Sequence, residues 1–359
     1  MRKRWLESLH IFTCNLYIFF FVCFLIGCSS FSRSELWAGD KPSHHTENAF
    51  QNYPLIEPPD AQGFRFIWNK IVSSSKSDKI PADHLIDKKR AIDRYRKLEN
   101  EDTVTWIGQS TALLKINGKV ILTDPFFAKR AGPGTFGPSR SVPPGITAGD
   151  LPAVNIIVIS HNHYDHLDAD FVESLPNKKN IDVVVPLGIG EFFRNKDYIK
   201  IHELDWHHSV TVKGLKFTSH PMVHYSSRGL FDKNKTLWCS WSILSSNKKL
   251  FFAGDTAFSP TIFKEIGTEI DGFDYALLPI GTYGNRKYGF NNHMNPMESF
   301  QAGLDLKAQT MIAIHWGTID LSEEPLFEPA KLFKKVAMEK QFDPKRLWIL
   351  KIGDTRVLE

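Results

Sequence analysis

The sequence of 359 residues has few cysteines, almost no excess of charge of one sign, and no internal repeat or heptad pattern. Its formal net charge is +4, so it lacks the basic footprint of nucleic-acid-binding proteins, and no nucleic acid is expected as a partner. Its four cysteines include no closely spaced metal-binding pair. Three of them lie within the first 28 residues, which leaves Cys239 alone and excludes a disulfide framework. Cys239 lies in a strand-like stretch, where a packed small side chain is expected rather than a nucleophile.

Residues 1–27 are predicted to be a lipoprotein signal peptide. A basic start is followed by an apolar run over residues 11–26, which is short for a membrane span of about 20 residues. The run ends in Leu25-Ile26-Gly27-Cys28, which resembles the lipobox of bacterial lipoproteins, where the cysteine receives lipid and becomes the new N-terminus. Ser29 stands where an aspartate would favour inner-membrane retention. The sequence therefore predicts an envelope protein anchored to the membrane through Cys28, in the outer membrane facing the periplasm.

Downstream of Cys28, composition predicts a tether and then one catalytic domain. Residues 28–52 are polar and are interpreted as a flexible tether, in which His44-His45 are expected to be solvated. Residues 53–359 form the predicted domain, with short β-rich runs from residue 103 onward and helical patterns between some of them. Asn117-Gly118 is a strong two-residue hairpin signal. The alternation predicts an α/β fold of two mixed sheets with helices outside.

One short segment carries the strongest chemical signal. Residues 154–160 are a nearly continuous apolar run, typical of a strand buried on both faces, and His161-Asn162-His163-Tyr164-Asp165-His166 follows directly. Side chains at positions i and i+2 of an extended segment point the same way, so His161 and His163 can share one ion. A turn into the next helix can bring Asp165 and His166 to a second ion. Imidazole and carboxylate are the ligands that zinc takes without cysteine.

Two metal ions need further ligands, and these are expected at the ends of other strands. Asp255 follows the apolar run 250–254, where it could bridge both ions, and His315 follows residues 311–314 in the same manner. The remaining ligand lies in residues 220–224, where periodicity alone does not separate His220 from His224.

The arrangement of these motifs resembles the metallo-β-lactamase superfamily and, more specifically, the family of phospholipases D that hydrolyse N-acylphosphatidylethanolamine. The similarity covers about residues 55–355. It is carried by the runs Trp106-Ile107-Gly108-Gln109-Ser110-Thr111, Leu122-Thr123-Asp124-Pro125, Gly137-Pro138-Ser139-Arg140, residues 160–168, Glu203-Leu204-Asp205-Trp206, His224-Tyr225-Ser226-Ser227-Arg228-Gly229, Thr236-Leu237-Trp238, residues 251–256, Pro279-Ile280-Gly281-Thr282-Tyr283 and residues 313–317.

The resemblance implies a four-layer αββα sandwich with two zinc ions along one edge. It favours His224 over His220, because the family's ligand precedes an aromatic residue and an Arg-Gly pair. One ion would be held by His161, His163 and His224, and the other by Asp165, His166 and His315, with Asp255 bridging them. The two cations would lower the pKa of a water between them and supply the hydroxide that attacks phosphorus.

Four residues are candidates for further roles around this site. Asp165 could also orient the hydroxide, and His293 occupies the place of a family histidine that lines the substrate cavity, where it could stabilise the transition state or protonate the leaving oxygen. The alternative for His293 is a helix-start histidine without chemistry. Tyr164 lies between ligands and could reach the substrate or simply pack. Asp124 could hydrogen-bond a ligand histidine or cap a turn.

Three departures from the family pattern concern the substrate. They are Pro296-Met297-Glu298-Ser299 in place of a more acidic run, Tyr225 where tryptophan is usual, and a less apolar segment over residues 284–290. The predicted function is a zinc-dependent phosphodiesterase of phospholipase D type that acts on N-acylphosphatidylethanolamine or a related phospholipid. The alternatives are a zinc lactonase, a broad phosphodiesterase, and a non-catalytic envelope lipoprotein. The sequence leaves the oligomeric state open, with a homodimer as one option.

Overall fold

The computed structural model describes residues 42–54, 79–288 and 291–359. The fold described below lies in the unit Ser43–Glu359. The predicted signal peptide and Cys28 lie outside the described residues. Within the described ranges, no helix has the length and apolar character needed to cross a membrane.

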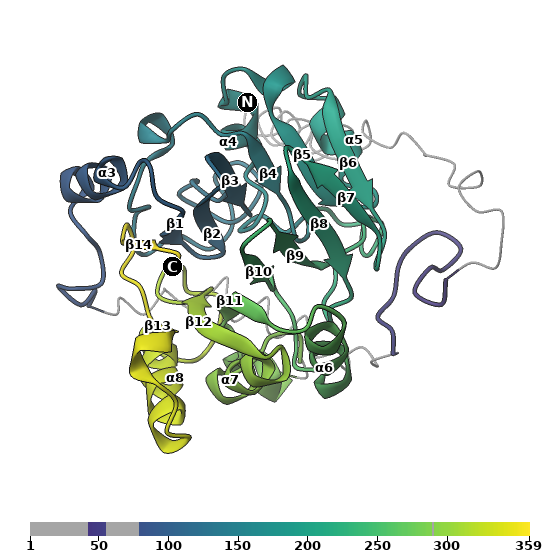
Figure 1. The fold of residues 1–359 in the computed structure, drawn as a ribbon. Coiled ribbons are helices and arrows are strands. Elements are labelled where there is room, and N and C mark those ends of the chain that lie inside the picture. Colours follow the sequence, from purple (N-terminus) through teal and green to yellow (C-terminus); the bar gives the residue numbers. More distant parts are fainter. Residues whose placement is uncertain (1–41, 55–78, 289–290) are drawn as a thin grey trace, which may run out of the picture. The chain divides into compact units, whose positions relative to one another are not determined.

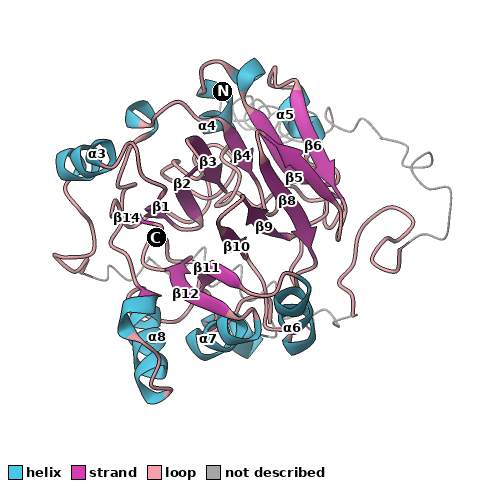
Figure 2. Cartoon of the chain, viewed as in Figure 1, coloured by secondary structure: helices cyan, strands magenta, loops and turns pink. Residues whose placement is uncertain are grey.

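Two seven-stranded mixed sheets form the centre of the unit (Figures 1 and 2). The first sheet has the order β14-β1-β2-β3-β4-β5-β6 and the second has the order β13-β12-β11-β10-β9-β8-β7. The strands are β1 (Thr103–Gly108), β2 (Thr111–Ile116), β3 (Lys119–Thr123), β4 (Ile156–Val158), β5 (Asp182–Pro186), β6 (Lys200–Leu204), β7 (Ser209–Val212), β8 (Leu215–His220), β9 (Ser240–Leu244), β10 (Lys249–Phe252), β11 (Phe273–Pro279), β12 (Ala308–Ile314), β13 (Leu347–Trp348) and β14 (Thr355–Val357).

Helices flank both sheets, as the sequence predicts. Helices α5 and α3 contact strands of the first sheet, and α7 contacts β11 and β12 of the second. The helices are α3 (Lys88–Lys97), α4 (Ala169–Ser174), α5 (Gly190–Arg194), α6 (Pro260–Glu269), α7 (Pro296–Asp305) and α8 (Glu328–Glu339), with 3-10 turns at Ala148–Asp150, Lys178–Asn180, Gly284–Tyr288 and Pro344–Arg346. Proline opens α6, α7 and α8 within the first turn, where its missing N–H has no intrahelical partner to lose. The predicted arrangement of two mixed sheets with helices outside is confirmed.

The β2–β3 hairpin shows how local sequence sets the register. Asn117 and Gly118 have φ angles of 49° and 69°, the left-handed values that a two-residue hairpin turn requires at both positions. The turn pairs Ile116 with Lys119 and then Ala112 with Thr123. Strand β3 therefore ends just before Asp124, a residue that later proves to contact the functional site.

The core explains why the strands read as apolar runs. In β1 and β2, Val104 and Leu114 belong to the large cluster between the two sheets, whereas Ile107 and Leu113 belong to the smaller cluster on the outer face of the first sheet. The central strands are thus buried on both faces, which requires continuous hydrophobic sequence rather than alternation.

The same edge of both sheets receives the functional residues. Strands β3 to β6 run parallel to one another, as do β10 to β12, so their carboxyl ends meet at one rim of each sheet. The sheets are joined at this rim, because Trp241 Nε1 donates to the Ile159 carbonyl at 2.8 Å and the Cys239 amide donates to the Ser160 carbonyl at 2.9 Å. The residues that follow β4, β10 and β12 therefore lie close together.

Residues 43–52 correct part of the predicted tether. His44, His45 and Phe50 are buried, and the Phe50 amide donates to the Asn234 carbonyl at 2.8 Å. The polar composition of this stretch suggested a solvated chain, but its one large apolar side chain and its paired histidines fix it to the domain. Residues 28–41 lie outside the described part of the chain.

Candidate metal centre

The turn after β4 gives the histidine motif its shape. The amides of His166 and Leu167 both donate to the His163 carbonyl, at 3.1 and 2.9 Å, which closes a helical turn. Asp168 then caps α4 by accepting from the Phe171 amide. His161 lies on the extended side of this turn, and Asp165 and His166 lie beyond it. This fold-back distributes the motif over two sets of donor atoms.

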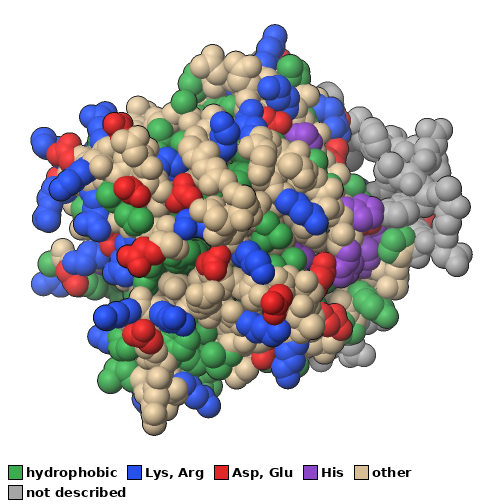
Figure 3. All heavy atoms as spheres, viewed as in Figure 1, with side chains coloured by type: hydrophobic (Ala, Val, Ile, Leu, Met, Phe, Trp, Pro, Cys, Tyr) green, Lys and Arg blue, Asp and Glu red, His purple; other side chains and the backbone are tan. Residues whose placement is uncertain are grey.

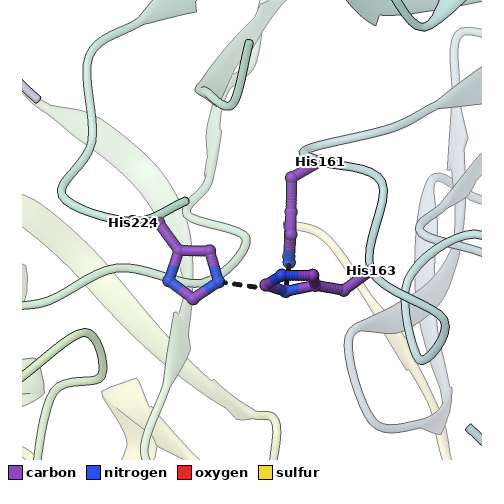
Figure 4. A group of neighbouring side chains, drawn as sticks. All are labelled: His161, His163 and His224. Carbon is purple, nitrogen blue, oxygen red and sulfur yellow. Dashed lines mark hydrogen bonds between the residues drawn. The ribbon is translucent and has the colours of Figure 1, made fainter. Parts of the chain in front are cut away.

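The first set consists of His161, His163 and His224, whose side chains point toward one another (Figure 4). His161 Nε2 lies 2.8 Å from His163 Nδ1, and His224 Nε2 lies 3.3 Å from the same atom. The structure brings His224, not His220, to this place. His220 is the last residue of β8, and its ring contacts Ser242 Oγ at 2.9 Å instead. This agrees with the choice that the resemblance implies.

The second set consists of two carboxylates and two imidazoles, Asp165, His166, Asp255 and His315. The Oδ2 atom of Asp255 lies 3.0 Å from Nε2 of both His166 and His315. The Oδ2 atom of Asp165 lies 3.4 Å from the same two nitrogens. Asp255 also groups with His224 of the first set and with His293. A carboxylate in this position can serve both sets.

The close approach of Asp255 depends on the residue before it. Gly254 has a φ of 61°, and a Cβ at this position would lie 2.4 Å from the Cβ of Ser160. Glycine therefore lets the end of β10 pass directly against the residue that precedes His161. His315 has a φ of 57°, which is unusual for a residue other than glycine, and its amide donates to the Gln109 carbonyl at 2.9 Å.

Hydrogen bonds at Nδ1 of His161 and His224 determine that each ring points its Nε2 toward the other members of the set. The Ser160 hydroxyl donates to Asp124, so it accepts from Nδ1 of His161, which leaves Nε2 as a bare lone pair. His224 donates from Nδ1 to the Asn292 carbonyl at 3.0 Å, so its Nε2 is also a lone pair. Both lone pairs face His163 Nδ1, which has at most one proton to share. Such a convergence of electron-rich atoms fits a cation.

Burial keeps the first set in the form that binds metal. Burial and the neighbouring His224 lower the pKa of His163 to about 3, and burial lowers the pKa of His224 to about 4. Burial, together with the other imidazoles, holds the pKa of His161 well below its ordinary value. All three rings are therefore neutral at pH 7, and neutral imidazole is the ligand form.

The second set is electrostatically different. Burial opposes charge here as well, but Asp255 and Asp165 raise the pKa of His315 to about 9 and raise that of His166 well above its usual value. The same interactions hold the pKa values of Asp165 and Asp255 well below normal, against the effect of burial. His166 Nε2 lies close to Asp255 without making a hydrogen bond. The two buried carboxylates of this set therefore favour a positive charge beside them.

The distances also fit a metal ion. Ligand atoms at about 2.0–2.2 Å from a tetrahedral ion lie about 3.3–3.6 Å from one another. The contacts between donor atoms, from 2.8 Å (His161 to His163) to 3.4 Å (Asp165 to His166 and His315), approach this spacing. Nitrogen and carboxylate donors without sulfur match the preferences of zinc.

A further shell of buried groups holds the donors in place. Asp124 is fully buried and accepts from His166 Nδ1 at 2.7 Å and from the Ser160 amide at 2.7 Å, so it contacts a candidate ligand rather than only capping a turn. Sequence reasoning missed Gln109, whose Nε2 lies 2.8 Å from both Asp165 Oδ2 and His315 Nε2. Its signals were its place in the Trp106–Thr111 run and, in the structure, a positive φ of 54°.

The two other predicted catalytic residues, His293 and Tyr164, have different surroundings. His293 is buried, with its ring 5.2 Å from that of His224 and 5.4 Å from that of His315. Its Nδ1 has no hydrogen-bond partner and lies 3.7 Å from Asp255 Oδ2. Tyr164 instead donates its hydroxyl to the Arg228 carbonyl at 2.9 Å. His293 thus borders the donor sets, whereas the Tyr164 hydroxyl already has a backbone partner.

Comparisons with known proteins agree with this site. The model of the β-lactamase superfamily domain family matches residues 119–316, more than half of the chain, and the chain therefore belongs to this family. It has the metallo-β-lactamase fold. The structure of a possible metal-dependent hydrolase from Veillonella parvula has the same fold, with a TM-score of 0.57, 17% sequence identity, and coverage of 72% of this chain and 99% of that one.

Two curated relatives are similar to this chain over about the same length. An N-acyl-phosphatidylethanolamine-hydrolyzing phospholipase D 1 of Caenorhabditis elegans is 36% identical over 244 residues, which span 65% of this chain and 68% of that protein. An uncharacterized protein of Mycobacterium tuberculosis is 40% identical over 243 residues, which span 66% of this chain but only 64% of the relative.

Asp124 offers a test of the metal centre that leaves every candidate ligand in place. Asp124→Asn should weaken zinc binding about 10–100-fold, because an amide cannot accept from both His166 and Ser160 as a carboxylate does. Competition against a chromophoric chelator measures the affinity. Asp170→Asn, an exposed acidic residue in the first turn of α4, is the control and should bind zinc as the unchanged chain does. Equal affinities of the two variants would contradict the assignment.

Proposed function

We propose that the protein is a dinuclear zinc phosphodiesterase of phospholipase D type, which hydrolyses N-acylphosphatidylethanolamine or a related phospholipid to phosphatidic acid and the released alcohol. The observation that carries the proposal is the pair of buried donor sets, with Asp255 grouped with members of both. The relative from Caenorhabditis elegans, with 36% identity, supports the choice of substrate class. Two divalent cations would activate a water between them and neutralise charge on the phosphoryl oxygens.

The chain's own groups would orient the reaction. The Gln109 amide donates to Asp165 Oδ2 at 2.8 Å, which fixes the carboxylate that orients the attacking water. His293 presents an unpartnered Nδ1 at the border of the two sets. It can donate a hydrogen bond to a phosphoryl oxygen or give a proton to the leaving oxygen. The burial of both residues keeps bulk water from competing for these hydrogen bonds.

Arg228 connects the histidine motif to the loop that continues to Leu230 and Phe231, and we infer that this loop contacts a lipid surface. Its Nη1 donates to the carbonyls of Asn162 and Leu167, at 2.9 and 2.7 Å, and its guanidinium lies 4.0 Å from the centre of the Tyr164 ring. We infer that Tyr164 acts mainly through this contact, as a support for the motif.

The tip of the same loop is apolar and exposed. Leu230 and Phe231 are 78% and 79% exposed. Asp232 accepts from the amides of Arg228 and Gly229, and this turn keeps both side chains outward. An apolar tip on the loop whose Arg228 contacts the motif would enter the acyl region of a bilayer and bring the headgroup to the site. The face visible in Figure 3 carries interspersed acidic and basic side chains.

A lipid anchor would place this surface next to its substrate. We propose that Cys28 carries the anchor and holds the enzyme at the bacterial envelope, on the periplasmic side of the outer membrane. The residues involved lie outside the described part of the chain, so the proposal stands on the lipobox-like sequence.

The substrate is tested with the full chain in detergent, assayed on N-acylphosphatidylethanolamine, plain phospholipids, lactones and a chromogenic phosphodiester. We expect phosphatidic acid and N-acylethanolamine as products. In ¹⁸O-labelled water the label should appear only in phosphatidic acid, because water attacks phosphorus and the bond from phosphorus to the ethanolamine oxygen breaks. His161→Ala, which removes a candidate ligand, should show no activity on any substrate. Hydrolysis of lactones alone would exclude the lipid, and no hydrolysis of any substrate would favour a non-catalytic lipoprotein.

The apolar tip gives an independent prediction about membrane seating. The double change Leu230→Ser and Phe231→Ser should lower turnover of lipid in vesicles about tenfold or more, because two apolar side chains no longer enter the bilayer. Turnover of a soluble phosphodiester should stay unchanged, since the donor sets are intact. Met338→Ser, an apolar residue 67% exposed on α8, serves as the control and should leave both rates unchanged. An equal loss on both substrates would refute a role in seating.

A further inference from the structure

Residues 43–54 form a short strap on the catalytic unit, outside the residues 119–316 that the family model matches. The strap is coloured purple in Figure 1. His45 and Phe50 pair in an antiparallel bridge, and the Thr46 amide donates to the Ala49 carbonyl at 2.9 Å. The strap is thus a folded turn with its own internal hydrogen bonds, which begins its contacts with the domain at His44.

Two histidines fasten the beginning of the strap. His44 Nε2 lies 2.7 Å from Asp205 Oδ1, and His45 Nε2 lies 2.8 Å from Asp205 Oδ2, with all three residues buried. The ring of His44 stacks on that of Trp206 at 4.2 Å. Each imidazole satisfies one carboxylate oxygen. His44, His45 and Asp205 lie close enough together to resemble a metal site, but these hydrogen bonds explain their proximity without an ion. The three residues attach the strap to the domain.

The end of the strap reaches a candidate metal ligand. The Asn52 side chain donates from Nδ2 to the His224 carbonyl at 3.0 Å and accepts the His224 amide on Oδ1 at 3.1 Å. It also accepts from Trp238 Nε1 at 3.1 Å. One amide side chain therefore satisfies both backbone polar groups of His224, as a neighbouring strand would do.

This pairing supplies what the local secondary structure lacks. Strand β8 ends at His220, and residues 221 to 224 continue without a sheet partner except for an isolated bridge between Val223 and Ala257. His224 is 2% exposed, so its backbone groups need partners within the protein. Asn52 fixes the backbone, and the Asn292 carbonyl fixes the ring at Nδ1. Together they set the direction of Nε2.

We propose that Asn52 is a positioning residue of the three-histidine set and that the strap is an integral part of the metal centre. The inference rests on the proposed function only in that His224 must bind metal, and it is independent of the substrate. Without Asn52, the backbone at His224 would lose both partners, and its imidazole would no longer be held toward His161 and His163. The second set, whose members are held by Asp124, Gln109 and one another, would keep its ion.

The test is a titration of the full metal-free chain with Co²⁺, followed by visible absorption, which reports the geometry of each bound ion. The unchanged chain should bind two equivalents. Asn52→Ala should weaken one of the two equivalents about 10–100-fold and change its absorption bands, while the other equivalent stays as it was. Asn52→Asp keeps the acceptor for the His224 amide and loses the donor to its carbonyl, so it should restore part of the affinity.

Gln51→Ala is the matched control, because the Gln51 side chain donates within the strap, to the Ser43 carbonyl, and does not reach His224. It should titrate like the unchanged chain. Thermal unfolding of the metal-free variants separates a local effect from a loss of folding, since Asn52→Asp must unfold near the temperature of the control. Two unchanged equivalents in Asn52→Ala would overturn the inference, as would equal weakening of both. A chain with two ions and no phospholipid hydrolysis would refute the proposed substrate while leaving the role of Asn52 intact.

Discussion

The lone pairs of His161 and His224 point at the same nitrogen of His163, and the structure gives no hydrogen bond that could satisfy all three. Burial lowers the pKa values of these imidazoles, so the rings are neutral. Burial also keeps water from hydrogen-bonding to their lone pairs. Beside them, two buried carboxylates face two further imidazoles. Both sets are therefore able to bind metal ions. The buried groups around the two sets hold the donor side chains in this arrangement.

That shell holds the rings of His166 and His161 at Nδ1, away from the donor atom, and holds Asp165 at the donor oxygen Oδ2 itself. Asp124 holds His166, Ser160 holds His161, and Gln109 holds Asp165, each through a hydrogen bond at a buried atom. The parallel strands deliver the ligands to one rim, and hydrogen bonds from β9 and from Cys239 close the two sheets against each other there. The candidate metal centre therefore lies at the junction between the sheets. The strap adds support for the backbone of His224, beyond the end of β8.

Much of this architecture could be predicted from local sequence. His161, Asp255 and His315 each follow an apolar strand, and a ligand-type residue at the end of a buried strand has few other reasons to be there. His220 and His224 could not be separated by periodicity, because His220 ends β8 and His224 follows it closely. The difference lies in Ser242, which engages His220 across the sheet, and in Asn52, which holds His224. Both partners are distant in sequence and carry no motif.

The misjudged segment has the same cause. Residues 43–52 have the polar composition of a tether, and what docks them is the pairing of His44 and His45 with one carboxylate more than 150 positions away. Composition reports the average of a segment, whereas docking depends on a few specific contacts.

The most direct measurement of the central claim is anomalous diffraction at the zinc edge from crystals of the full chain grown with zinc. Two peaks about 3.5–4 Å apart, one among His161, His163 and His224 and the other among Asp165, His166 and His315, would agree with it. A single peak, or none at these residues, would contradict it.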